Sequence, residues 1–223
     1  DYIVHGGDRL GLYYYEESAA LRSSSIVYDR EDSSITTIKS GMIDWKKTFS
    51  EARLFHWSGI TSAVSQGAAE VTNEAVEEAA REGITISCDI NYRANLWKYG
   101  KDAHDVLLPI AQKSDIVFGT ADEWKLITGI TPPDFKATTP DYPIDSAAYK
   151  EYFGKASKIL PKAKKMIVAL RNTLSANHHL LSGVIFADGK LYTTRIYDID
   201  DVLDPMGVGD AFIAAYLHAH LKY

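Results

Sequence analysis

The residues best suited to chemistry stand together late in the chain, where positions 204–212 read DPMGVGDAF ahead of the apolar run 213–217. A tight Gly-x-Gly turn that opens a helix aims unpaired backbone N–H groups and the positive end of the helix dipole at one point, which suits a phosphate. Asp210 follows this turn directly. A carboxylate there would repel a resting phosphate, so we expect it to take the proton of a hydroxyl that attacks the phosphate.

The same residues also allow a purely structural interpretation. Asp is a favoured helix N-cap and Gly a favoured turn residue, so Gly-Val-Gly-Asp taken alone is equally an ordinary loop with an acidic cap. Short motifs recur by chance, and for these few residues the two interpretations stand about even. The complete run over 204–212 favours the functional interpretation.

The complete run resembles the carboxyl-terminal signature of the ribokinase-type (pfkB) carbohydrate kinases, in which Asp-x-x-Gly-x-Gly-Asp precedes a small residue and an aromatic one. The resemblance implies that Asp210 is the catalytic base and that the anion hole is formed by Gly207, Val208 and Gly209. Other stretches, in the same order as in the family, resemble its 2-keto-3-deoxygluconate kinases: RLGLY at 9–13, VYDR at 27–30, LFHWSGIT at 54–61, and DINYR at 89–93 with Leu96-Trp97 behind it. The chain has no Gly-x-x-x-x-Gly-Lys-Ser/Thr loop, which disfavours a P-loop kinase.

For the substrate, the resemblance assigns the carboxylate and hydroxyls of a sugar acid to Arg93, Tyr28 and Arg30, with Tyr13 and Tyr92 as further contacts. A carboxylate is best paired by a planar cation, and Arg supplies that geometry where Lys gives a point charge. The alternative is that the tyrosines pack on strand faces and that both arginines are solvated, because Tyr is a frequent strand residue. Arg93 fits this alternative least, since it follows the carboxyl end of an expected strand, where ligands bind in α/β sheets.

For the nucleotide and the metal, the resemblance implies ATP and Mg²⁺. Residues 119–123 (GTADE) stand where the family has Asn-x-x-Glu, so Glu123 is carried over as a residue that acts on the magnesium shell through water, whereas Thr120 replaces the Asn. Arg171 is expected to end a strand and to neutralise nucleotide phosphates, together with the backbone of Gly207 and Gly209. The alternative for Glu123 is that it only favours a helix N-terminus by its charge.

Composition narrows the class of protein. The chain has 223 residues, 46% of them hydrophobic and 24% charged, which is ordinary for a globular protein with one sizeable core. The net charge of −6 argues against a nucleic-acid or anionic-membrane partner, because both require a basic face. Cys88 is the single cysteine, and no apolar run of about 20 residues or signal peptide is visible, so a reducing, cytoplasmic setting is the default expectation.

Both ends of the sequence look cut. The chain starts at Asp1 without Met, and the Gly-Gly-x-x-x-x-Asn substrate motif that the family carries near its N-terminus is expected upstream, a role that Gly6-Gly7 does not fill. After Tyr223 the family continues with further helices that help close the nucleotide pocket. We therefore expect an incomplete kinase, infer function for the parent protein, and doubt that these residues alone are active.

Two parts are expected to position these residues. Residues 9–40 contain two β-rich runs, 10–16 and 25–29, and a third possible strand at 34–38, which together predict a small antiparallel sheet. From Arg53 onward strands and helices alternate, which favours a parallel sheet with covering helices. The expected strands are 53–57, 84–89, 115–118, 165–170 and a hairpin of 183–187 with 190–194 around Asp188-Gly189; the expected helices are 65–82, 102–113, 121–128 and 146–160.

Two further segments carry expectations. Residues 131–145 hold four prolines and are expected to form a surface insertion without regular structure. His178-His179 is expected in an exposed loop rather than at a metal, because adjacent side chains point apart.

The sequence thus predicts an α/β fold: a ribokinase-like parallel-sheet core flanked by helices over 41–223, with a small β-sheet lid over 9–40. The resemblance implies an ATP-dependent kinase that phosphorylates 2-keto-3-deoxygluconate, or a close keto-deoxy acid, on its primary hydroxyl. A kinase of a neutral sugar such as fructose or ribose, and an inactive ligand-binding module, remain the alternatives. Because exposed strand edges often pair with a second subunit, a homo-oligomer formed through the lid is expected.

Overall fold

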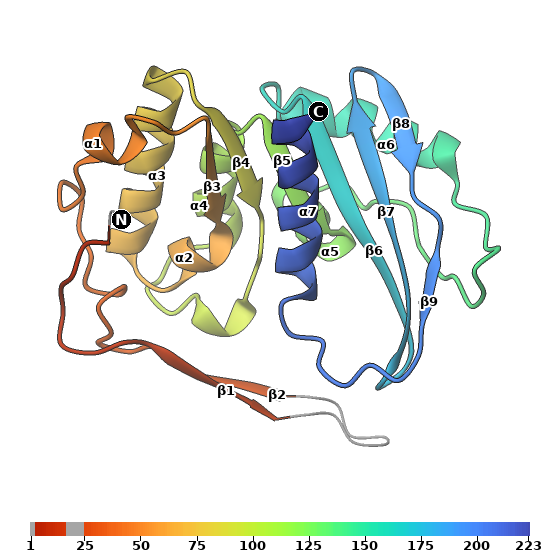
Figure 1. Cartoon of the computed structure of the whole chain (residues 1–223), viewed down its shortest axis with the longest axis horizontal. Helices are drawn as coiled ribbons and strands as arrows, with labels where there is room; N and C mark the ends of the chain where they lie inside the picture. The colour runs from red at the N-terminus through yellow and green to blue at the C-terminus, as the bar shows by residue number, and fades with distance from the viewer. Residues whose placement is uncertain (1–2, 17–24) are drawn as a thin grey trace.

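The computed structural model describes residues 3–16 and 25–223 and contains two separate sheets (Figure 1). The small sheet is a hairpin of β1 (Leu12–Glu16) and β2 (Ser25–Asp29), which pair antiparallel with Tyr13 opposite Tyr28. The third strand expected at 34–38 is wrong, because these residues form turns. Thr36 donates to the Ser33 carbonyl through both its backbone N–H (2.9 Å) and its hydroxyl (2.7 Å), and such local bonds compete with strand pairing.

The large sheet has seven strands, in the order β3-β4-β5-β6-β7-β8, with β9 pairing with β7. The strands β3 to β6 are parallel and β6, β7 and β8 are antiparallel, as the alternation and the hairpin predicted. Asp188 (φ 51°) and Gly189 (φ 72°) both adopt the left-handed conformation that this tight turn requires. The strands are β3 (Leu54–Ser58), β4 (Thr85–Asp89), β5 (Ile116–Thr120), β6 (Lys165–Ser175), β7 (His178–Ala187), β8 (Lys190–Thr193) and β9 (Tyr197–Ile199).

The strands β6 and β7 are longer than the sequence predicted. Arg171 therefore lies within β6 rather than at its end, and His178 and His179 belong to β7 rather than to a loop. The insertion at 131–145 has no helix or strand, as expected, but Ala137 within it is fully buried in a small cluster with Leu180 and Ile196.

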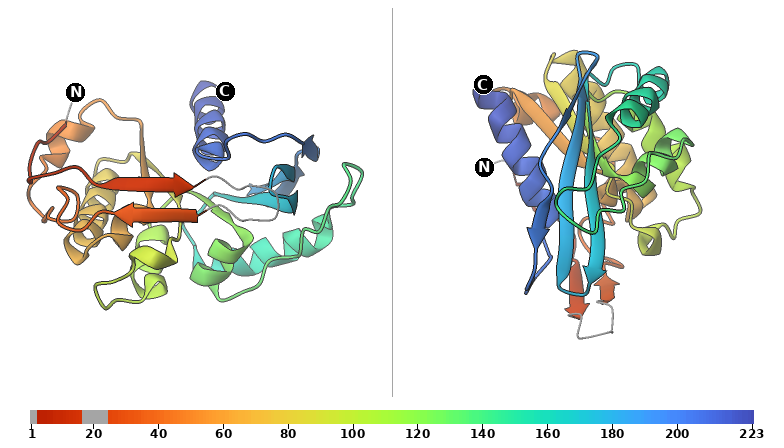
Figure 2. Two further views of the ribbon diagram at one scale, coloured as in Figure 1. Left: turned by 90° about the horizontal axis from the view of Figure 1, so that it is seen from below. Right: turned by 90° about the vertical axis from the view of Figure 1, so that its right-hand side faces the viewer.

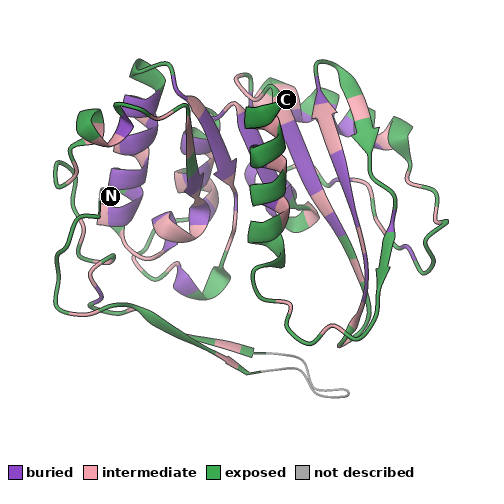
Figure 3. Cartoon of the chain, in the orientation of Figure 1, coloured by how far each residue is buried: buried purple, intermediate pink, exposed green. Residues whose placement is uncertain are grey.

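Helices cover the large sheet on both faces. The main core packs α3, α4, α5 and α6 on one face, through side chains such as Val76, Leu107, Trp124 and Phe153. On the opposite face lies α7, which buries a stripe of Ile213 and Leu217 against β5 and β6 and exposes its outer side (Figure 3). The helices are α1 (Trp45–Phe49), α2 (Gly59–Ala63), α3 (Gln66–Arg81), α4 (Ala103–Ala111), α5 (Ala121–Thr128), α6 (Ser146–Ile159) and α7 (Val208–Lys222).

The carboxyl ends of the parallel strands and the start of α7 lie at the same edge of the large sheet. The side chain of Lys165, at the start of β6, bonds to that of His220 near the end of α7 (2.8 Å), so α7 runs antiparallel to β6. The first turn of α7 therefore lies at the edge where the parallel strands end. The β1-β2 hairpin runs beneath this edge in two perpendicular views (Figures 1 and 2). In the part of the chain that is described, no helix is long and apolar enough to cross a membrane.

Candidate active site

The start of α7 has the geometry that the sequence predicted. Gly207 is the N-cap with φ 76°, a left-handed conformation that glycine adopts without strain, and no side chain caps the helix. The Ala211 N–H makes the first helical bond, to the Gly207 carbonyl (2.8 Å). The N–H groups of Val208, Gly209 and Asp210 therefore have no carbonyl partner within the helix and can receive an anion, with the exposed Asp210 in the same turn.

Three carboxylates from different elements, here called the carboxylate cluster, lie at this edge, where the charges of Glu123 and Asp210 both reach Asp89. Asp89 ends β4, Glu123 lies in the first turn of α5, and Asp210 lies in the first turn of α7. Burial is the main cause that raises the pKa of Asp89 to about 7; the charge of Glu123 raises it further and that of Asp210 adds to this, while Arg93 opposes them. Asp89 is thus a carboxyl group poised between its two protonation states near neutral pH, and such groups are common at functional sites.

Glu123 has the capping role considered from the sequence, and its role toward magnesium stays a prediction. Its Oε2 accepts the Thr120 N–H (2.8 Å) and the Thr120 hydroxyl (2.9 Å), and Thr120 in turn caps the helix, which forms a capping box. Its Oε1 accepts the Tyr92 N–H (2.9 Å) and lies 3.8 Å from Nη1 of Arg93. The Glu123 carboxylate, which takes part in capping α5, is therefore also part of the carboxylate cluster.

The segment that follows β4 directs Arg93 toward this cluster. Asn91 has φ 38°, an unusual conformation for a residue with a side chain, and its Nδ2 donates to the Ser58 hydroxyl (2.9 Å). The Arg93 side chain is 43% exposed, and its Nη1 donates to the Tyr92 carbonyl (3.0 Å). The Tyr92 ring packs against the main core, so only the backbone of this residue is seen to touch the cluster.

The expected lid residues stand on the hairpin. Tyr13 and Tyr28 are directly opposite each other and so share one face of the β1-β2 sheet. The Arg30 guanidinium carbon lies 5.4 Å from the centre of the Tyr28 ring. Among the described residues, no hydrogen bond or ion pair joins these three side chains to the carboxylate cluster.

Arg171 lies on the face of the sheet that α7 covers. Its Nη2 is 3.0 Å from Nε2 and 3.3 Å from Nδ1 of His179, which is only 4% exposed. Burial lowers the pKa of His179 and the Arg171 charge lowers it further, so the ring is held neutral and can accept from Arg171. A Cβ on Gly183 would lie 3.3 Å from the ring of Phe212, and Gly183 is paired with Ala169. Because α7 and β6 run in opposite directions from that contact, Arg171 lies toward the start of α7.

Sequence reasoning left two residues of this edge without a role. Asp89 is half-buried beside other charged groups, and His56 on β3 bonds through Nδ1 to the Ser87 hydroxyl (2.6 Å). Burial lowers the pKa of His56, and the Asp210 charge opposes that change, so His56 lies within electrostatic reach of the expected base. His56 was visible as a polar residue within the apolar run 54–57, and Asp89 as an acidic residue at the carboxyl end of an expected strand, which are the signals that could have identified them.

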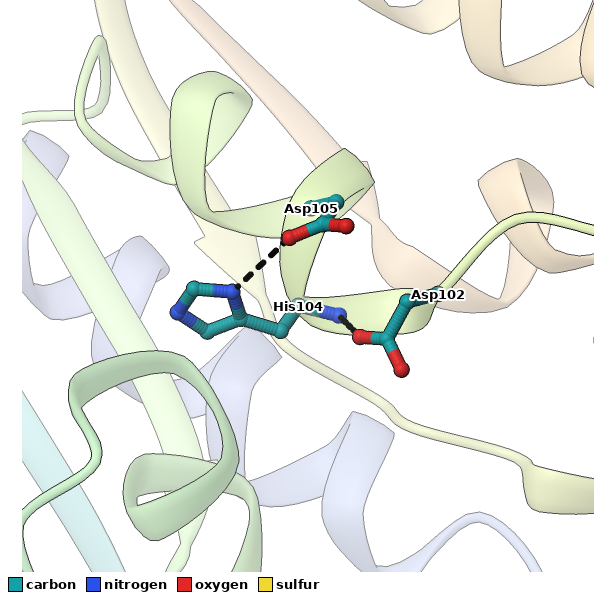
Figure 4. A group of neighbouring side chains, drawn as sticks. All are labelled: Asp102, His104 and Asp105. Atoms are coloured by element: carbon teal, nitrogen blue, oxygen red, sulfur yellow. Dashed lines mark hydrogen bonds and ion pairs between the residues drawn. The ribbon is translucent and has the colours of Figure 1, made fainter.

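A second group of metal-binding residue types lies at the start of α4, where Asp102, His104 and Asp105 lie close together (Figure 4). The Asp102 Oδ1 accepts the His104 backbone N–H (2.8 Å), which is an ordinary helix cap, and His104 Nδ1 lies 3.3 Å from Asp105 Oδ1. Helix capping accounts for this arrangement without a bound ion.

Known proteins resemble this chain over almost its whole length. The 2-dehydro-3-deoxygalactonokinase of Haloferax volcanii is 26% identical over 209 residues, which are 94% of this chain and 57% of the relative. The 5-dehydro-2-deoxygluconokinase of Clostridium beijerinckii is 25% identical over 217 residues, which are 97% of this chain and 57% of the relative.

A solved structure agrees with the fold. The crystal structure of 2-dehydro-3-deoxygluconokinase from Thermotoga maritima matches 100% of this chain and 65% of its own, with 31% identity and a TM-score of 0.87. The chain therefore spans between half and two-thirds of the length of these relatives. These comparisons confirm the predicted ribokinase-like α/β fold.

The family assignment rests on a match to nearly every residue. The model of the pfkB carbohydrate kinases matches residues 1–222, which include both the signature at 204–212 and the segments quoted for the resemblance. This chain belongs to the pfkB family of carbohydrate kinases.

Proposed function

We propose that the protein to which this chain belongs is an ATP-dependent kinase of 2-keto-3-deoxygluconate, or of a close keto-deoxy sugar acid, which transfers a phosphoryl group to the primary hydroxyl. The observation that carries the proposal is the first turn of α7, where the Asp210 carboxylate stands beside N–H groups that have no partner within the helix. A base and an oxyanion site in one turn are what phosphoryl transfer to a hydroxyl needs.

In the proposed mechanism Asp210 takes the proton of the sugar hydroxyl as its oxygen attacks the γ-phosphorus of ATP. The new O–P bond forms while the bond to the ADP oxygen breaks, and the proton remains on the Asp210 carboxyl group. The N–H groups at the Gly207–Gly209 turn stabilise the negative charge that grows on the transferring phosphoryl oxygens. Holding both reactants in line at this edge supplies much of the acceleration.

A magnesium ion prefers oxygen ligands and usually keeps several waters, so the carboxylates at this edge suit an ion that they contact largely through water. When bound, the ion supplies charge neutralisation for the phosphates. On Glu123, Oε2 already accepts two hydrogen bonds and Oε1 accepts one, so this residue suits contact through water. Asp89, which lies within electrostatic reach of Glu123, is the second residue that would hold the ion.

We propose that the substrate carboxylate pairs with Arg93 and with the hairpin residues Tyr28 and Arg30, with Tyr13 and Tyr92 nearby. Arg93 is half-exposed at the carboxyl edge, so its guanidinium is free to reach a ligand there. Both curated relatives described above are named as kinases of keto-deoxy sugar acids, which supports an acidic substrate for this protein too. Arg171, toward the start of α7, is the proposed cation for the ATP phosphates.

The hairpin is proposed as a lid, with residues 9–40 covering the substrate and residues 41–223 forming the core. It is also the proposed contact with a second copy of the protein. One face of the hairpin carries Leu12, Tyr14 and Val27, which are 47%, 59% and 62% exposed. Exposed apolar side chains on an isolated two-stranded sheet favour such a contact, because a hairpin alone is marginally stable.

A phosphorylation assay on the whole protein tests this function. ADP release would be followed with keto-deoxy sugar acids and with neutral sugars, in the unmodified protein and in the Asp210→Asn variant. We expect turnover on an acid, and a loss of at least about a hundredfold in kcat for Asp210→Asn with unchanged substrate binding.

The outcomes separate the candidates. Turnover on fructose or ribose alone would favour the neutral-sugar kinase, and binding without turnover would favour the inactive module. Near-normal turnover by Asp210→Asn would remove this residue from the mechanism.

A further inference from the structure

The base of the β1-β2 hairpin is held by one arginine that the proposed site does not use. Arg9 precedes β1, and its guanidinium makes a two-pronged pair with Asp29 at the end of β2: Nη1 donates to Oδ2 (3.1 Å) and Nη2 to Oδ1. Nη2 also donates to the Asp29 carbonyl (3.0 Å), and Nε donates to the Glu31 carbonyl (3.3 Å). The guanidinium thus bonds to the residues on both sides of Arg30.

The backbone completes this arrangement. The Arg9 carbonyl accepts both the N–H and the hydroxyl of Ser34 (2.8 Å each). The Arg30 carbonyl accepts the N–H (3.2 Å) and the hydroxyl (2.6 Å) of Ser33. The segment from Asp29 to Ser34 therefore bonds to Arg9, which lies 20 or more positions earlier in the chain.

Arg30 itself has few restraints on its side chain. Its Nε is buried without a hydrogen-bond partner, and its guanidinium carbon lies 5.4 Å from the Tyr28 ring centre. A cavity of about 350 Å³ at the hairpin base is lined by Arg30 together with Gly7, Leu10, Gly11 and Ile38. Because this space leaves one side of Arg30 unpacked, the position of its guanidinium depends on how firmly its backbone is held.

The Arg9–Asp29 pair contributes little to the free energy of folding. The two side chains are 37% and 43% exposed, and ion pairs at that exposure contribute little to folding because water screens them. Its geometry is nevertheless specific, since two parallel bonds and two carbonyl contacts converge on one planar group.

We propose that Arg9 is a positioning residue, which fixes the end of β2 so that Tyr28 and Arg30 are presented together to the carboxylate of the substrate. This inference rests on the proposed function for the identity of the substrate. It assigns to Arg9 an effect on the binding of the acid, with no part in the phosphoryl transfer step.

The experiment compares Arg9→Ala and Arg9→Lys in the whole protein with Arg81→Ala as a matched control. Arg81 is also an exposed arginine that pairs with carboxylates, those of Glu77 and Glu78 on α3. Two measurements are made on each variant: KM and kcat for the keto-deoxy acid and for ATP, and amide hydrogen exchange of residues 25–34 without substrate.

For Arg9→Ala we expect KM for the acid to rise about tenfold, as for loss of one charge-assisted arrangement, while kcat and KM for ATP stay within about twofold. Exchange should accelerate at residues 25–34 and remain unchanged in the large sheet. Arg9→Lys should recover only part of both effects, because Lys forms a single-point contact. Arg81→Ala should leave both measurements unaltered.

Three results would overturn the proposal. Arg9→Ala could show faster exchange with unchanged KM for the acid, or a raised KM with unchanged exchange. Arg9→Lys could restore both measurements to their wild-type values. Failure of the proposed function is distinguishable, because the unmodified protein would then show no turnover of the acid. In that case the exchange measurement still decides whether Arg9 holds this segment, and the substrate role is refuted.

Discussion

The half-buried carboxyl group of Asp89 should make the free energy of unfolding depend on pH. Its usual pKa of 3.8 is raised to about 7 in the folded protein, first by burial and then by the charge of Glu123. The folded state therefore holds a proton that the unfolded chain releases. The stabilisation from this proton is complete below pH of about 4 and is lost as pH rises through about 7.

We expect Asp89→Asn to remove this loss, because the amide keeps the shape of the neutral carboxyl group and does not ionise. The pKa is 3.8 in the unfolded chain and about 7 in the folded protein. The difference in free energy of unfolding between variant and wild type should therefore change by about 3 kcal/mol between pH 5 and pH 8. The shift favours the variant at pH 8. Contributions from His56, His179 and His220 are common to both proteins and cancel in the difference.

The assay is denaturant unfolding of both proteins at several pH values from 5 to 8, in EDTA so that no divalent ion binds the cluster. Glu151→Gln is the control, because Glu151 is exposed on α6 and, among the described residues, its one ion pair is with Lys155. Its stability curve should run parallel to that of the wild type. Parallel curves for Asp89→Asn and wild type would refute the reasoning, since Asp89 would then ionise equally in both states.

Two further predictions concern substrate and assembly. Arg93→Lys should raise KM for the keto-deoxy acid by roughly ten- to a hundredfold and leave KM for ATP nearly unchanged, because Lys cannot pair with a carboxylate through two bonds. Steady-state kinetics check this, and equal affinity of the unmodified enzyme for an acid and its uncharged alcohol analogue would contradict it. Val27→Asp, on the exposed hairpin face, should shift the protein toward the monomer, as measured by light scattering after size exclusion. The control Leu203→Asp, which changes an apolar residue that is 88% exposed, should not change the mass. An unchanged mass for Val27→Asp would exclude this interface.

Much of the fold could be predicted because its signals are local. The capping residue Thr120 and Glu123 stand three positions apart, and the turn at Asp188-Gly189 needs only two residues that accept positive φ. The start of α7 is similar, since Gly207 and the residues after it define an anion-binding turn within one segment. For such features the sequence contains both partners of the interaction side by side.

Local signals also misled in places. Residues 34–38 have a strand-like pattern, yet they form turns. The Thr36 hydroxyl donates to the nearby Ser33 carbonyl, and the Ser34 hydroxyl donates to the distant Arg9 carbonyl. The strand β6 continues past Arg171 because β7 continues beside it, with Arg171 paired with Leu181. The length of a strand depends on its neighbour, which no single segment specifies.

The alternation of elements, the pfkB signature and the residue types at the carboxyl edge can be identified from the order of the amino acids. Which of these residues act on one another depends on how the chain folds. Asp89, Glu123 and Asp210 are spread over more than a hundred positions and come together because the parallel strands end, and α7 begins, at one edge. Burial and neighbouring charges act on a side chain through space, whatever their distance along the chain. The pKa of Asp89 and the ion pair of Arg9 with Asp29 therefore arise from contacts between segments that are distant in the sequence.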